Sequence, residues 1–112
     1  MKISYKFVRL IGTRESLNVF FLNAEIFLAS EIQGLGKELM QTLDVAIRID
    51  MPLVVNFQGV RSISSALIGK LVMLNKKARA SRVKLEFREM NDAVRNVIQN
   101  VTRALPFENE SD

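Results

Sequence analysis

The sequence predicts a single α/β domain with a mixed four-stranded sheet and the element order β-β-α-β-α-β-α. Two apolar segments open the chain, and three segments with apolar residues at helical spacing follow. A short apolar or alternating run separates each successive pair of these helical segments, which is the pattern of strand-helix-strand units with parallel strands. A length of 112 residues suits one domain that buries a substantial core.

The first two strands are expected to form a hairpin. In residues 3–10 apolar and polar residues alternate, and the phase slips near Phe7, which predicts a strand with a bulge at that point. Residues 12–16 provide the turn, and the more apolar run 17–22 provides the second strand.

The first helix is predicted to start at a capping box formed by Ser30 and Gln33 and to end near Asp44. Its buried face carries Ile32, Leu35, Leu39 and Leu43. Gly34 and Gly36 lower the intrinsic helix propensity, and we interpret them as sites where the backbone packs closely on the sheet.

A buried strand at residues 53–55 follows, with Pro52 tolerated at its first position, and the chain then turns at Gln58 and Gly59. Ser64 and Ser65 stand where the second helix begins, and a serine side chain there can accept a hydrogen bond from the first free amides. The apolar face of this helix carries Leu67, Ile68, Leu71, Val72 and Leu74. Such a positive helix end favours anions, including a phosphate on these hydroxyls.

Residues 83–88 alternate as a strand exposed on one face, and Asn91 is predicted to cap the last helix. The buried stripe of that helix is Val94, Val97, Ile98, Val101 and Leu105, and Pro106 ends it. We expect two right-handed crossovers between parallel strands, one domain over residues 1–107, and a mobile acidic tail at 108–112.

The composition excludes much chemistry. The chain has no cysteine and no histidine, so it lacks a thiol nucleophile, an imidazole base and the usual zinc ligands. Its carboxylates are scattered near the ends of predicted elements, without the pairing that a glycosidase or two-metal site needs. The sequence therefore predicts a protein that is not an enzyme and that needs no metal or cofactor.

The formal net charge is +4, and the basic residues crowd the second helix and the next strand. They are Lys70, Lys76, Lys77, Arg79, Arg82, Lys84 and Arg88. Nucleic-acid binding would interleave such cations with exposed aromatic residues, but the phenylalanines at 7, 20, 21, 27, 57 and 87 lie in apolar patterns. We therefore favour a solvated basic face over a nucleic-acid site; an acidic protein or an anionic membrane face also fits it.

No apolar stretch reaches the ~20 residues that cross a bilayer, and the first six residues contain no apolar core of a secretory signal. The sequence thus predicts a cytoplasmic location without membrane insertion.

Residues 53–69, with their strand, Gly59-Val60, Ile63 and the paired serines, resemble the STAS family of sulfate-transporter and anti-sigma-antagonist domains. Residues 69–80 resemble the second helix of that family, and residues 91–97 resemble the start of its last helix. Free-standing bacterial members of this size are anti-sigma factor antagonists. The resemblance thus implies binding to a partner-switching serine kinase of the anti-sigma type, which phosphorylation of a serine at the start of the second helix prevents.

The family pattern here is Asp-Ser-Ser/Thr-Gly-Leu-Gly, and this chain departs from it. A gapless register places Ser64 on the Asp, Ser65 on the first hydroxyl, Ala66 on the usual phosphoacceptor and Leu67 on the Gly. Two alternatives stay open: Ser65 has taken over the acceptor role, or phosphate does not switch the partner contact. The family's Thr-Gly-Leu stretch after the last helix's opening is also replaced, here by Val101-Thr102-Arg103.

The resemblance implies a partner-binding surface formed by Gly59, Arg61, Ser62, Ile63, Ser64, Ser65, Ala66, Leu67 and Lys70. Ser65 is the first candidate for phosphorylation and Ser64 the second. The alternative functions are a cytosolic STAS subunit of an ABC-type lipid transporter, docked on its ATPase, and a basic nucleic-acid-binding module. A homodimer is also left open.

Overall fold

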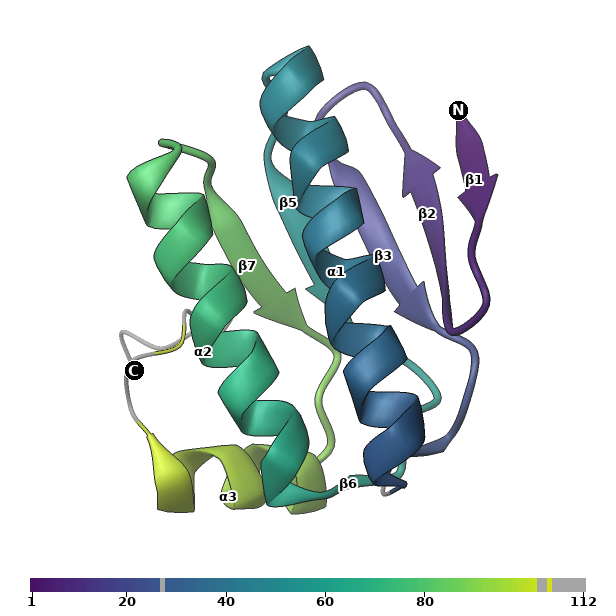
Figure 1. The fold of residues 1–112 in the computed structure, drawn as a ribbon, viewed down its shortest axis with the longest axis vertical. Coiled ribbons are helices and arrows are strands. Elements are labelled where there is room, and N and C mark those ends of the chain that lie inside the picture. Colours follow the sequence, from purple (N-terminus) through teal and green to yellow (C-terminus); the bar gives the residue numbers. More distant parts are fainter. Residues whose placement is uncertain (27, 103–104, 106–112) are drawn as a thin grey trace.

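A mixed five-stranded sheet with helices against one face organises the chain (Figure 1). The computed structural model describes residues 1–26, 28–102 and 105. The strands are β1 (Lys2–Ser4), β2 (Val8–Gly12), β3 (Leu17–Phe21), β4 (Glu25–Ile26), β5 (Leu53–Asn56), β6 (Ser62–Ile63) and β7 (Leu85–Arg88). The helices are α1 (Ala29–Ile49), α2 (Ser65–Ala80) and α3 (Asp92–Val101).

The strand order in the main sheet is β1-β2-β3-β5-β7. The strands β1, β2 and β3 pair antiparallel, whereas β3, β5 and β7 are parallel and are connected through α1 and α2. The predicted fold class, the hairpin of β2 and β3 and the two parallel crossovers are therefore confirmed. Both crossover helices lie on the same face of the sheet (Figure 1).

The sheet contains one strand more than predicted, because the expected bulge near Phe7 is a turn between two strands. The amide of Tyr5 donates to the carbonyl of Val8 at 2.9 Å. The carboxylate of Glu38, on α1, accepts hydrogen bonds from the amides of residues 6, 7 and 8 at 3.2, 2.8 and 3.2 Å. This acceptor comes from a distant helix, so the local apolar pattern cannot indicate it.

The core lies between the sheet and the helices. The alternation of each strand directs apolar side chains to this side: Val8, Leu10, Leu17, Val19, Phe21, Leu53, Val55, Leu85 and Phe87 are all buried. The rings of Phe21 and Phe57 pack edge to face with centroids 4.9 Å apart, and those of Phe57 and Phe87 are 5.8 Å apart. The aromatic residues at these three positions are thus core residues, as their sequence pattern indicated.

The bounds of α1 differ from the prediction. Its N-cap is Leu28, so Ser30 lies inside the helix and the predicted capping box is wrong. The helix also continues past Asp44 to Ile49, because its buried face extends to Ala46, and it ends where Asp50 adopts a left-handed conformation with φ 56°.

The two glycines of α1 allow close packing, but against neighbours other than the sheet. A Cβ atom at Gly34 would lie 2.6 Å from Cε2 of Phe7, in the turn between β1 and β2. A Cβ atom at Gly36 would lie 2.7 Å from Cδ of Lys70, on α2.

The last helix is shorter than predicted. Its buried residues are Val94 and Ile98, whereas Val101 is 57% exposed, so its assignment to the buried stripe is wrong. The helix ends at Val101 because Thr102 is extended, with φ −154° and ψ 149°. Leu105 is buried although it follows the helix. Pro106 and the predicted tail at 108–112 lie outside the described residues.

Candidate partner-binding site at the start of α2

The candidate site lies at the edge of the sheet where the parallel strands end and where α1 and α2 both begin (Figure 1). Residues 57–64 cross this edge from β5 to α2 and contain β6. Ligands of open sheets of parallel strands commonly bind at this carboxyl edge, since its loops converge there.

The first half of this loop is a tight turn. The side chain of Asn56 accepts from the amide of Gln58 at 2.8 Å, and the amide of Val60 donates to the carbonyl of Phe57 at 2.9 Å. Gly59 has φ +83°, and no described atom lies within 4 Å of a Cβ built on it. Glycine is therefore favoured here by its backbone angle and not by lack of space. The predicted turn at Gln58 and Gly59 is confirmed.

A two-residue strand pair fixes the second half of the loop. The strand β6 pairs in parallel with β4, and the amides of Arg61 and Ser64 donate to the carbonyls of Ala24 and Ile26 at 2.7 and 2.9 Å. The Arg61 guanidinium also contacts the Glu25 carboxylate at 3.0 Å, with both side chains more than half exposed. The sequence does not indicate this strand pair, because two residues are too few to show a period.

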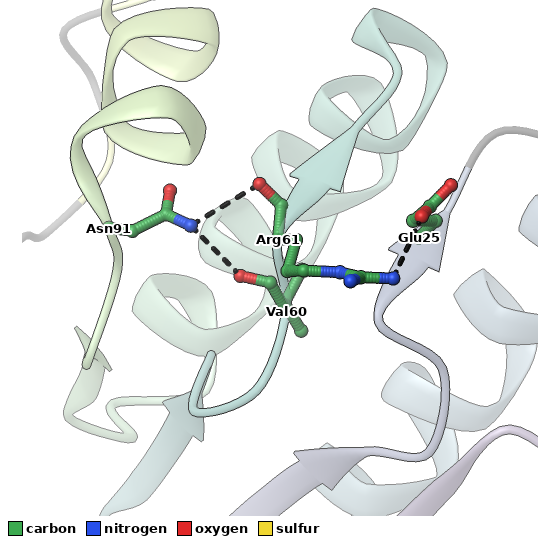
Figure 2. A network of polar contacts seen from close by, with 4 residues as sticks. All are labelled: Glu25, Val60, Arg61 and Asn91. Atoms are coloured by element: carbon green, nitrogen blue, oxygen red, sulfur yellow. Dashed lines mark hydrogen bonds and ion pairs between the residues drawn. The ribbon is translucent and has the colours of Figure 1, made fainter.

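Asn91 connects the same loop to α3 (Figure 2). Its Oδ1 accepts from the amide of Val94 at 2.8 Å, which confirms the predicted cap. Its Nδ2 donates to the carbonyls of Val60 and Arg61 at 3.3 and 3.2 Å. One side chain therefore satisfies both the first turn of α3 and the loop before α2, and the loop is held from two sides.

The two serines at the junction differ in accessibility. Ser64 is the N-cap residue of α2, yet its side chain makes no capping bond, and its Oγ is buried without a hydrogen-bond partner among the described residues. The expectation that the Ser64 hydroxyl caps the helix is therefore wrong. Ser65 is the first residue of α2 and is exposed, as is Ala66 beside it.

The other residues of the predicted surface divide into two groups. Gly59 and Arg61 are exposed, while Ser62 and Lys70 are half-buried, and Lys70 Nζ donates to Oε1 of Gln33 at 3.1 Å. The side chains of Ile63 and Leu67 belong to the core, with exposed fractions of 4% and 0%. These two side chains therefore pack in the core beneath the loop and are not accessible to a partner.

Two exposed leucines at the same edge were not singled out in the sequence. Leu22 follows β3 and is 46% exposed, and Leu28 precedes α1 and is 62% exposed. The apolar run 17–22 predicts that Leu22 belongs to the strand, but β3 ends one residue earlier, at Phe21. Their exposure adds apolar area beside the polar loop.

Among residues 1–26, 28–102 and 105, no group of three or more acidic side chains is arranged to hold a metal ion. Within the same residues, no helix has the length and apolar character needed to cross a membrane.

A mixed sheet with two crossover helices on one face and a junction held by hydrogen bonds at its carboxyl edge defines a small α/β domain. A family model described as Mlab, STAS domain matches residues 28–102. The chain therefore belongs to the STAS domain family, a class of regulatory protein-interaction domains.

Among solved structures, the anti-sigma factor antagonist SpoIIAA in its unphosphorylated form is similar to this chain. The TM-score is 0.63 and the sequence identity 15%, over 90% of this chain and 86% of that chain. The likeness therefore concerns the fold. No curated protein matches the sequence at a significant level.

Proposed function

We propose that this protein is an anti-sigma factor antagonist that binds a serine kinase of the anti-sigma type through the edge at the start of α2. The observation that carries the proposal is the exposure of Ser65 as the first residue of a helix whose preceding loop is held by β4 and Asn91. In this proposal the protein acts in the bacterial cytoplasm, regulates transcription by partner switching, and performs no catalysis.

Ser65 is the phosphoacceptor in this proposal. Ala66, at the family's usual acceptor position, has no hydroxyl, and the hydroxyl of Ser64 is buried. A kinase therefore reaches the Ser65 oxygen without rearranging the loop. This geometry supports the alternative in which Ser65 has taken over the acceptor role.

The charge of the phosphate determines its effect. A phosphoserine carries about −1.5 to −2 charges at neutral pH, and at the first turn of a helix it meets free amides and a favourable dipole. The folded domain thus tolerates the modification. When a partner docks on this surface, the phosphate must be desolvated, and this costs binding free energy. Phosphorylation therefore weakens binding without unfolding the protein.

Affinity capture from the source cells tests this proposal. The tagged protein, Ser65→Ala and Ser65→Asp are used as baits, and Ser81→Asp, which adds the same charge at the far end of α2, is the control. We expect the wild type, Ser65→Ala and Ser81→Asp to retain the same kinase and Ser65→Asp to lose it. Mass spectrometry of the 64–65 peptide checks for the phosphate. Equal capture by all four baits would contradict the proposed switch.

A second candidate is the STAS subunit of an ABC-type lipid transporter, docked on the ATPase. Ala66 favours it, because an unphosphorylatable residue at the usual acceptor position suits a permanent contact. In that case the same capture experiment would retain a transporter ATPase, and Ser65→Asp would bind it as well as the wild type. A nucleic-acid module would instead bind DNA with an affinity that falls steeply with salt, and no protein would be retained.

A further inference from the structure

A groove runs between α1 and α2 on the side of these helices that faces away from the sheet. It encloses a hollow of about 210 Å³ lined by Gln33, Gly36, Lys37, Met40, Lys70 and Met73. The two helices lie side by side on the same face of the sheet (Figure 1). The exposed lining residues Gln33, Lys37 and Met73 place the groove on the outer surface of this helical layer. It includes Lys70, the last residue of the predicted partner surface, which lies five residues beyond Ser65 along α2.

Gly36 makes room for the side chain of Lys70. Because this residue has no side chain, the aliphatic part of Lys70 lies directly against the α1 backbone, and its ammonium group reaches Gln33. This solvent-exposed hydrogen bond places the ammonium group of Lys70 at the rim of the groove.

The rim is positively charged. Lys37 is exposed and Lys70 is half-buried, and the six lining residues include no carboxylate. Two carboxylates of α1 have partners elsewhere: Glu38 accepts from the amides of residues 6 to 8, and Asp44 pairs with Lys77 at 2.9 Å. The groove therefore presents two lysines whose charges are not balanced by a carboxylate within its lining.

The middle of the groove is apolar and adaptable. Met73 is 56% exposed and Met40 is half-buried, and methionine side chains readily reshape to fit a bound apolar group. Ala66 and Gly69 precede Met73 on the exposed side of α2, and no described atom lies within 4 Å of a Cβ built at Gly69. Small residues at these positions let another helix approach closely.

We propose that the groove binds an acidic amphipathic helix of the partner protein. An apolar side chain of that helix inserts between Met40 and Met73, and its carboxylates contact Lys37 and Lys70. This inference rests on the proposed function and specifies the partner segment. It also accounts for the switch, because Ser65 lies five residues, or about 7.5 Å along the axis, before Lys70. A phosphate at Ser65 would repel the same acidic helix.

The test is an NMR titration of the full ¹⁵N-labelled chain with synthetic helical peptides of about 15 residues, long enough to form a helix. One peptide carries glutamates around a central leucine, the second replaces the glutamates by lysines, and the third replaces the leucine by serine. We expect the first peptide to shift the amide signals of the six lining residues and the other two to bind at least about tenfold more weakly.

Charge reversal provides the matched variants. Lys37→Glu combined with Lys70→Glu is expected to weaken binding of the acidic peptide about tenfold or more. Lys2→Glu combined with Lys84→Glu makes the same change of net charge at exposed sites outside the groove and is expected to change binding less than about twofold.

Several results would overturn the inference: no shifts at millimolar peptide, shifts outside the groove, equal binding of the lysine peptide, or equal effects of the two double variants. A titration with octanoate tests whether the groove binds a small amphiphilic anion. If octanoate shifts the groove signals and the peptides do not, the groove does not bind a helix.

The capture assay separates the groove proposal from the proposed switch at Ser65. Capture that depends on Ser65 but not on Lys37 and Lys70 would refute only the groove.

Discussion

Replacing Ser64 by alanine is expected to stabilise the protein, which is the opposite of the usual effect at a helix N-cap. A serine cap normally contributes about 1 kcal/mol through its bond to a first-turn amide. Here that bond is absent, and the hydroxyl is buried without a partner among the described residues. Removing such a group relieves a desolvation cost of about 1 to 3 kcal/mol, and the lost contacts of the oxygen offset part of this gain.

The net expectation for Ser64→Ala is a gain of about 0.5 to 1 kcal/mol, or a rise of roughly 2 to 5 °C in Tm for a domain of this size. Urea unfolding followed by circular dichroism measures the free energy, and an unchanged m-value shows that the two-state comparison holds.

Asn91→Ala is the matched control, because Asn91 occupies the N-cap of α3 and makes the bonds that Ser64 lacks. It is expected to lose about 2 kcal/mol or more, since a cap and two further hydrogen bonds disappear together. A loss of about 1 kcal/mol in Ser64→Ala would refute the reasoning, because it would show that the serine caps α2 in solution.

Substitutions at four further positions test the fold. Gly34→Ala is expected to lose about 1 to 2 kcal/mol by pressing on the Phe7 ring, while Gly36→Ala is nearly neutral because it meets a flexible lysine stem; thermal melts compare them. Glu89 has φ 62°, so Glu89→Gly is expected to gain about 0.5 to 1 kcal/mol in urea unfolding and Glu89→Ala nothing. The hydrogen bond from Arg88 lowers the pKa of the Glu86 carboxyl. The ionised Glu86 therefore stabilises the fold at a pH above the ordinary glutamate pKa, and this stabilisation is lost as the pH falls through the lowered pKa. The stability difference between wild type and Glu86→Gln is therefore expected to shrink in acid; a constant difference would contradict this.

Much of the fold follows from local periodicity. The alternation at 83–88 and the apolar spacing after Ser65 both correspond to observed elements, because one face of each is buried on the same core. The cap at Asn91 was predictable for a similar reason, since its partner amide lies only three residues away.

The differences arise where distant groups decide the local structure. The turn at residues 5–7 depends on the carboxylate of Glu38, and the loop before α2 depends on β4 and on the Nδ2 atom of Asn91. None of these contacts is visible in a window of neighbouring residues.

For the candidate site, the sequence located the helix start but not the accessibility of its hydroxyls. Two adjacent serines are chemically alike, and only the path of the loop buries the oxygen of Ser64 and leaves Ser65 exposed. The groove is not predictable from the sequence either, because it depends on the packing of Lys70 of α2 against Gly36 of α1.

The most direct test of the central claim is the dissociation constant of the captured partner for wild type, Ser65→Ala and Ser65→Asp, measured by titration calorimetry. The account predicts that Ser65→Ala binds like the wild type and that Ser65→Asp binds at least about tenfold more weakly, with thermal midpoints that agree within about 2 °C. Equal dissociation constants for the three proteins would contradict it.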